Sequence, residues 1–188
     1  IFRGATLVYT NGNPITKGLS DTFLFQFLGQ GYIVGIPFPV IIMFIVFIVL
    51  YVLLHKTAFG KSVYAIGGNE KAAYISGVKL NKVKIIIYSI SGIMASISGL
   101  IITSRLSSAQ PTAGASYEMD AIAAVVLGGT SLSGGKGRIL GTLIGALIIG
   151  VLNNGLNIIG VSAFWQQVVK GVVILIAVLI DRFKVVKQ

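Results

Sequence analysis

Two Gly-Lys stretches are the first residues in this sequence that could hold a phosphate. A phosphate-binding loop needs a glycine, four residues and then Gly-Lys-Ser/Thr, so that its backbone N–H groups surround the phosphate. Gly60-Lys61-Ser62 would require a glycine at His55, and Gly135-Lys136 would require one at Thr130. Neither stretch fits, so both lysines are better explained as charges at the inner face of a membrane. The sequence has no cysteine and one histidine, so metal or Cys-His chemistry is not expected.

Polar side chains within apolar segments are the second group that could do chemistry. Lys170 is the one charge inside a late apolar helix, eleven residues or about 16 Å from Asp181. An ionisable group at that depth is either functional or a lysine that extends to the interface or pairs with carbonyls. Asn153, Asn154 and Asn157 lie near the outer end of a helix. Their carboxamides either hydrogen-bond a polar ligand or satisfy the helix end and its loop.

The composition indicates what kind of protein carries these side chains. Hydrophobic residues make up 55% of the 188 residues, charged residues make up 11%, and the mean hydropathy is +0.92. Soluble domains carry about a quarter charged residues, which makes a water-soluble globular domain a poor fit. Cytoplasmic loops of membrane proteins concentrate Lys and Arg, so the net charge of +10 does not require a nucleic-acid partner. We expect an all-α, polytopic transmembrane helical bundle.

Four apolar segments are expected to cross the bilayer, whose core is about 30 Å thick. They are residues 36–54, 85–104, 139–156 and 163–180. The segment 121–132 is short for a span, so we expect a short or re-entrant helix there.

Glycines are spaced for close contacts between helices. Gly137, Gly141 and Gly145 recur every four residues along one face of the third span. Such a face lets another helix approach closely. The glycines between residues 128 and 135 either form an unwound stretch that lines a pathway or pack tightly against a helix.

The distribution of basic residues predicts the orientation. Residues 55–84 form the longest polar stretch and carry six lysines against a single acid, so we place them in the cytoplasm. Segment 11–35 is then an outer loop, with a short helix or strand around Thr22–Leu28, and residues 106–120 also lie outside. The basic segment 133–138 and the basic C-terminus return to the cytoplasmic side.

A short helix is expected inside the polar stretch. The segment 67–77, GGNEKAAYISG, contains a glycine break, a favourable N-cap in Asn69, an acid in the following turn and a terminal glycine, Gly77. These signals predict a helix over about 70–76. Two turns are not stable alone in water, so this helix either docks into a partner or is a solvated connector.

The same segment carries a family resemblance. Ala72-Ala73, three residues and then Gly77 resemble the core of the EAA loop of bacterial ABC importer permeases, whose coupling helix inserts into a groove on the ATPase subunit. The Pro that often ends this motif in other importer classes is absent, as it commonly is in ribose-type permeases. The fuller pattern, including GGNEKAAYISGVKLNKVK and IYSISGIMASISGLI, is similar to the ribose-type (monosaccharide) permeases. The similarity covers nearly the whole chain and is densest over 60–160.

The resemblance implies that residues 1–188 are the C-terminal part of one permease transmembrane domain, whose N-terminal half is absent. Such a subunit forms the pathway of an ATP-driven sugar importer, with ribose favoured, in the bacterial inner membrane. It does no covalent chemistry and needs no cofactor. Its implied partners are an ABC ATPase, a second permease copy in a homodimer, a periplasmic or extracellular sugar-binding protein and membrane lipid.

The resemblance also suggests roles for particular residues. The ATPase-coupling residues would be Gly68, Asn69, Glu70, Lys71, Ala72, Ala73, Ser76 and Gly77. Candidate pathway or substrate residues are Gln110, Thr130, Asn153, Asn154, Asn157 and Lys170. Glu118 and Asp120, expected on the outer loop, would contact basic residues of the binding protein.

Two other classes remain open. A secondary transporter or channel for a small polar solute would need no ATPase, but such proteins usually carry acidic or His residues within their spans, and the clear spans here have none. A membrane anchor or assembly factor is compatible with the glycine faces but leaves the segment Ala72–Gly77 unexplained. An enzyme is least favoured, because no set of base, nucleophile and metal ligands is present.

Overall fold

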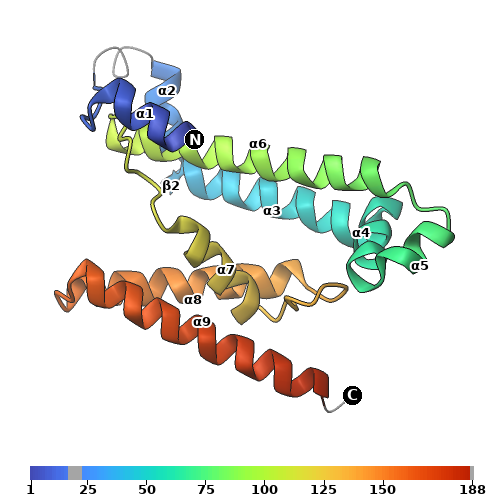
Figure 1. Cartoon of the computed structure of the whole chain (residues 1–188). Helices are drawn as coiled ribbons and strands as arrows, with labels where there is room; N and C mark the ends of the chain where they lie inside the picture. The colour runs from blue at the N-terminus through green and yellow to red at the C-terminus, as the bar shows by residue number, and fades with distance from the viewer. Residues whose placement is uncertain (17–22, 187–188) are drawn as a thin grey trace. The chain divides into compact units, whose positions relative to one another are not determined.

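The computed structural model describes residues 1–16 and 23–186, with Ala177 and the residues from Ile180 onward described by their backbone alone. The basic C-terminal side chains therefore lie outside the described part. The described chain is built from helices, which confirms the all-α prediction (Figure 1). In chain order the elements are α1 (Phe2–Thr10), α2 (Phe23–Gln30), β1 (Tyr32–Ile33), β2 (Ile36–Pro37), α3 (Phe38–Lys56), α4 (Ala58–Gly68), α5 (Glu70–Ile75), α6 (Leu80–Leu106), α7 (Tyr117–Leu127), α8 (Ile139–Ile158) and α9 (Ala163–Val186).

Three helices of the described part are long and apolar enough to cross a membrane, judged by length and composition. They are α3, α6 and α8, and they overlap the segments 36–54, 85–104 and 139–156. Helix α9 covers the fourth expected segment, and Ala163–Ile176 is its apolar part.

The polar stretch 55–84 is mostly helical, which differs from the expected loop with one short helix. Helix α3 continues to Lys56, α4 follows at once, and α6 already begins at Leu80. Helix α4 begins after Thr57, whose side-chain oxygen accepts a hydrogen bond from the Gly60 N–H at 3.3 Å. Threonine is a favourable N-cap residue, so the signal for this additional helix was present in the sequence.

The chain divides into two compact units. The first contains Ile1–Val49 and Lys84–Ala115, and the second contains Leu50–Val83 and Ser116–Gln188. Helices α3 and α6 each contribute residues to both units.

The first unit contains an unexpected β-hairpin between α2 and α3. Tyr32 pairs with Pro37 and Ile33 with Ile36, so the turn consists of Val34 and Gly35. Both turn residues have positive φ, 50° and 79°, as the favoured two-residue hairpin turn requires. The short helix expected around Thr22–Leu28 is present as α2, while Thr22 itself lies outside the described residues.

A buried serine holds α2 against the C-terminal end of α6. Ser104 is 1% exposed, its Oγ accepts a hydrogen bond from the Gly29 N–H at 2.9 Å, and its hydroxyl donates to the Phe25 carbonyl. Nearby, Gln30 Nε2 donates to Ser107 Oγ at 2.9 Å. These hydrogen bonds hold α2 both near its start, at Phe25, and at its end, at Gly29 and Gln30.

We therefore expect Ser104→Ala to lower the stability of the protein by about 1–2 kcal/mol, because buried polar groups of α2 lose their partner. Thermal unfolding of the detergent-solubilised protein measures this loss. Ser98→Ala is the matched control on the same helix, since Ser98 is exposed and its hydroxyl donates to the Met94 carbonyl of its own helix, at 2.9 Å. Equal melting temperatures for the two variants would contradict the prediction.

The second unit has a small core around α7. Ala123, Ala124 and Ile149 are at most 6% exposed, and Val173 and Ile174 of α9 pack against them. Small alanines on α7 let both α8 and α9 approach this short helix closely.

Helix α7 begins earlier than expected. It runs from Tyr117 to Leu127, whereas the sequence predicted a short helix over 121–132. Glu118 and Asp120 therefore lie in the first turn of a helix, so the loop conformation predicted for them was wrong. Acidic side chains suit the positive end of a helix dipole, which accounts for this earlier start.

Helices α7 and α8 meet backbone to backbone. A Cβ added at Gly145 would lie 2.9 Å from the Ala124 carbonyl carbon and 3.0 Å from the Gly128 nitrogen, and one at Gly141 would strike the Gly128 carbonyl. This is the close helix approach expected for Gly141 and Gly145. Gly137 lies before α8 begins and faces the Thr130 side chain instead.

Candidate functional site

Helix α5 has the ends that the sequence predicted. The Asn69 side chain caps its start by accepting a hydrogen bond from the Ala72 N–H at 3.0 Å, and Glu70 lies in the first turn. At the other end Gly77 has a φ of +83°, and its N–H donates to the Tyr74 carbonyl at 2.9 Å. The observed helix, Glu70–Ile75, matches the predicted range of about 70–76.

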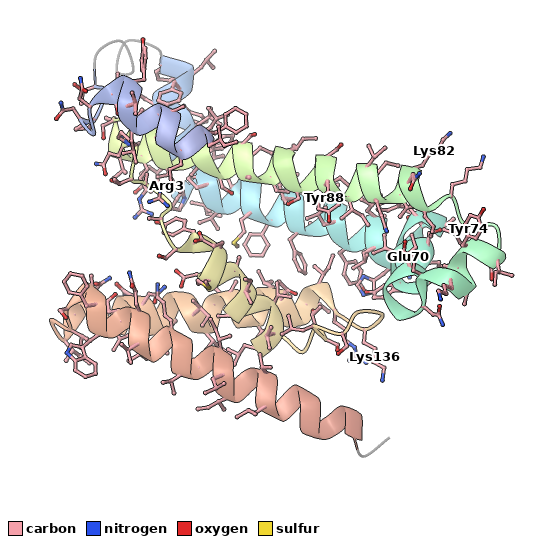
Figure 2. The ribbon with its side chains drawn as sticks, in the orientation of Figure 1. Arg3, Glu70, Tyr74, Lys82, Tyr88 and Lys136 are labelled. Atoms are coloured by element: carbon pink, nitrogen blue, oxygen red, sulfur yellow. The ribbon has the colours of Figure 1, made fainter. Side chains whose placement is uncertain are left out.

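The two faces of α5 differ sharply. Ala73 is 4% exposed, so it faces the protein, whereas the preceding residue, Ala72, is exposed. Tyr74 and Ile75 are 69% and 84% exposed. Figure 2 labels Tyr74 on α5. A short helix that presents two large apolar side chains outward has a surface suited to a protein partner.

A shallow hollow lies beside this exposed face. It has a volume of about 540 Å³ and is lined by Glu70, Lys71, Tyr74, Ile75 and Leu80. Tyr74 and Ile75 were not among the predicted coupling residues. Their signal was available, because two large apolar residues within a polar segment are unusual for a solvated connector.

Helix α4, which directly precedes α5, packs against the loop between α7 and α8. The Tyr64 hydroxyl donates to the Gly137 carbonyl at 2.8 Å, and Gly67 lies against Gly134 and Gly135. A cavity of about 340 Å³ lies at this contact, and Thr130 is among its lining residues. Thr130 therefore lies close to α4. It belongs to the loop that contains the glycines between residues 128 and 135.

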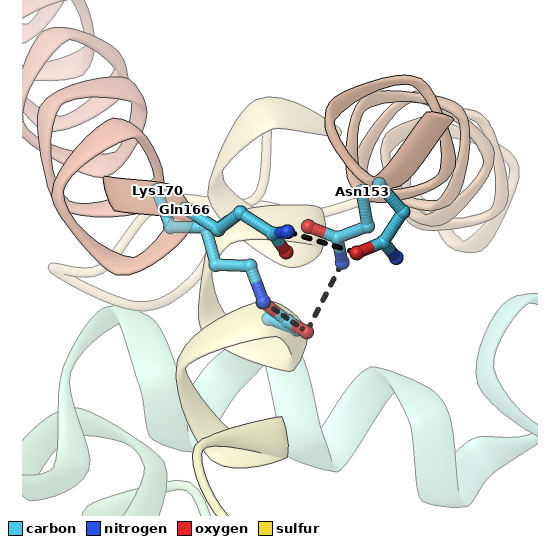
Figure 3. Close-up of polar contacts among 5 residues, drawn as sticks. Asn153, Gln166 and Lys170 are labelled. Atoms are coloured by element: carbon cyan, nitrogen blue, oxygen red, sulfur yellow. Dashed lines mark hydrogen bonds and ion pairs between the residues drawn. The ribbon is translucent and has the colours of Figure 1, made fainter. Parts of the chain in front are cut away.

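A polar cluster joins α7, α8 and α9. Lys170 Nζ lies 2.8 Å from Asp120 Oδ1 and 2.9 Å from Oδ2, and Asn153 Nδ2 donates to Oδ2 at 3.3 Å (Figure 3). The Lys170 and Asp120 side chains are only 16% and 20% exposed. Asn153 Oδ1 is buried and accepts no hydrogen bond from the described residues. Lys170 thus pairs with a carboxylate, a partner that neither sequence alternative included.

The other two asparagines differ from Asn153. Asn157 Oδ1 accepts a hydrogen bond from Gln166 Nε2 at 2.8 Å (Figure 3). The same nitrogen also donates to the Val161 carbonyl. Asn157 therefore ties the end of α8 to the start of α9, which is the helix-end alternative stated for these residues. Asn154 is exposed.

The remaining predicted site residues do not join this cluster. Glu118 is exposed on the first turn of α7, whereas Asp120, two residues further, is paired with Lys170. Gln110 is exposed in the turn region after α6 and belongs to the first unit. The structure therefore brings together Asp120, Asn153 and Lys170.

The sequence matches known proteins along nearly its whole length. Residues 2–178 match the family described as branched-chain amino acid transport system / permease component. The ribose import permease protein RbsC of Bacillus subtilis (strain 168) is 68% identical over 184 residues, which are 98% of this chain and 57% of that protein. RbsC of Escherichia coli (strain K12) is 59% identical over 185 residues, which are 98% of this chain and 58% of that protein.

A relative named for another sugar is more distant. The D-allose transport system permease protein AlsC of Escherichia coli (strain K12) is 43% identical over 182 residues, 97% of this chain and 55% of that protein. No solved structure shows significant similarity. The chain spans a little over half the length of these relatives. The three long apolar helices among the described residues indicate a multi-pass membrane protein. The chain belongs to the family described as branched-chain amino acid transport system / permease component.

Proposed function

We propose that this chain is the C-terminal part of the permease subunit of an ATP-driven sugar importer, with ribose as the transported sugar. The observation that carries the proposal is the 68% identity to a ribose import permease over 98% of the chain. In this role the chain forms part of the translocation pathway in the bacterial inner membrane and performs no covalent chemistry. A separate ABC ATPase hydrolyses ATP, and a second permease copy, an external sugar-binding protein and surrounding lipid complete the assembly.

The exposed face of α5 is the proposed contact with the ATPase. Its cap at Asn69 and its stop at Gly77 give a two-turn helix a defined shape, and Ala73 anchors it to the protein. Tyr74 and Ile75 supply apolar area toward a partner. The predicted cytoplasmic location of the lysine-rich segment 55–84 is consistent with this contact.

The polar cluster is the proposed pathway element of this chain. Asn153 retains a buried acceptor, and Lys170 can donate three hydrogen bonds, so both groups can bind sugar hydroxyls when the helices rearrange. The other proposed pathway residues do not contact the ion pair between Asp120 and Lys170. They are Gln110, Thr130, Asn154 and Asn157. For docking of the binding protein, Glu118 is the better supported acid, since the Asp120 carboxylate is engaged by Lys170.

Capture of the ATPase tests the proposed function. We expect the full-length permease carrying this chain to retain an ABC ATPase when purified from membranes, and Ala72→Arg to lose it, because the exposed small surface of α5 would then carry a long cation. Immunoblotting for the ATPase after affinity purification measures this. Ala113→Arg is the matched control, because Ala113 is exposed but lies in the segment predicted to face outside. Absence of an ATPase from the unchanged permease would favour a channel or secondary transporter.

A further inference from the structure

The end of α4 touches the loop between α7 and α8 through backbone atoms. A Cβ added at Gly67 would lie 2.6 Å from the Gly135 nitrogen, and one at Gly135 would lie 2.8 Å from the Gly68 Cα. A Cβ at Gly134 would strike the Gly67 carbonyl. Gly134 and Gly135 also have φ values of +86° and +74°, which L side chains rarely adopt. Glycine is therefore required here both by space and by conformation.

A second contact fixes the same loop to α4. Tyr64 lies three residues before Gly67 on this helix, and its hydroxyl donates to the Gly137 carbonyl at 2.8 Å. Helix α4 thus holds the loop at two positions, Tyr64 and Gly67, which are about one helical turn apart on α4. A contact made of backbone atoms and one short hydrogen bond cannot absorb a displacement by changing rotamers, as a contact between long side chains can.

The two segments that meet at this contact, α4 and the loop between α7 and α8, are each joined to a proposed functional element. Asn69 is at once the C-cap of α4 and the N-cap of α5, so the two helices share a single residue as their joint. The loop follows α7 and leads into α8. Gly128 at the end of α7 and Gly141 in the first turn of α8 lie at its two ends, where the two helices meet through backbone atoms. A continuous series of close contacts therefore leads from α5 to the helices that carry Asp120 and Asn153.

We propose that the Gly67–Gly135 contact transmits displacements of α5 to α7 and α8, with Gly67, Gly134, Gly135 and Tyr64 as positioning residues for transport. The proposal rests on the proposed function, in which the ATPase binds α5. It adds residues that touch neither the ATPase face nor the polar cluster. Spatial continuity alone does not establish coupling, so the test must separate coupling from binding and from folding.

The test uses the assembled transporter in proteoliposomes and measures ribose taken up per ATP hydrolysed. Gly67→Ala should still capture the ATPase and hydrolyse ATP, because the outer face of α5 is unchanged, but its uptake per ATP should fall by at least about fivefold. Gly92→Ala is the comparison. A Cβ at this exposed position of α6 meets nothing within 4 Å, so we expect a clearly smaller fall than for Gly67→Ala.

A milder variant protects the test against misfolding. Tyr64→Phe keeps the ring and removes only the hydroxyl that binds Gly137, so uptake per ATP should fall while the amount of permease in the membrane stays the same. Tyr88→Phe is the control, because Tyr88 is 77% exposed. Unchanged uptake per ATP in both Gly67→Ala and Tyr64→Phe would overturn the inference and leave the proposed function intact. Failure of the unchanged permease to capture an ATPase would overturn both.

Discussion

Replacing Lys170 with leucine is expected to destabilise the protein by about 3–5 kcal/mol, because the Asp120 carboxylate would lose its cation in a largely buried position. Nζ lies within 2.9 Å of both carboxylate oxygens, and the two side chains are 16% and 20% exposed. Asn153 is the other donor to this carboxylate, at 3.3 Å, and a neutral amide does not compensate the charge. Thermal unfolding in detergent and the amount of permease in membranes measure the loss.

The control and the rescue test the ion pair directly. Lys56→Leu removes an exposed lysine at the end of α3 and should change the melting temperature little. The double variant Asp120→Leu/Lys170→Leu removes both charges, and replacing a whole buried pair by apolar residues is often neutral, so it should regain most of the stability. The pairing would be contradicted if the double variant were as unstable as Lys170→Leu alone.

Uptake by the double variant separates two roles of the cluster. If the ion pair only holds α7 against α9, ribose uptake should return together with stability. The proposed pathway role predicts that uptake stays low in a stable double variant, because the sugar would lose the donors of Lys170. Measuring both quantities on the same membranes distinguishes these outcomes.

The features predicted from the sequence are those with a local cause. Runs of about 20 predominantly apolar residues without a charge predicted the helices α3, α6 and α8, because such a run forms a helix of bilayer length. The N-cap Asn69 and the glycine at 77 predicted α5 almost to the residue, since each acts on a backbone group only three positions away. The four-residue glycine spacing likewise predicted the close approach at Gly141 and Gly145.

The features missed by the sequence analysis depend on distant partners or on competing signals. Lys170 and Asp120 are 50 residues apart, and no periodicity indicates that a lysine in α9 and an acid in α7 will meet. Asp120 was placed in the segment 106–120, before the short helix expected over 121–132, yet the acids lie in the first turn of α7. Helix α4 was obscured by Lys61 and by glycines, which are typical of a polar connector, although Thr57 caps it well.

The contact between α7 and α8 leads to the second large effect. Gly145→Ala should destabilise the protein by about 1–3 kcal/mol, because the added methyl would press on the Ala124 carbonyl and on the Gly128 nitrogen, which are backbone atoms that cannot turn aside. Gly150→Ala is the matched control on the same helix, since a Cβ there meets nothing within 4 Å. That variant should be neutral or more stable by up to about 1 kcal/mol, the gain in helix propensity. The same substitution is thus expected to lower the melting temperature at Gly145 but not at Gly150, five residues away.

A double variant shows whether the effect arises at the interface between the helices. A Cβ at Gly128 would lie 2.5 Å from the Gly141 carbonyl carbon, so Gly128→Ala strains the same contact from the α7 side. Once Gly145→Ala has moved the helices apart, Gly128→Ala should cost less than it does alone, whereas Gly145→Ala and Gly150→Ala should add. Additive losses for Gly145→Ala and Gly128→Ala would mean that each glycine acts within its own helix. Sub-additive losses identify the backbone contact itself as the element that holds α7, with Asp120 at its start, in place against α8.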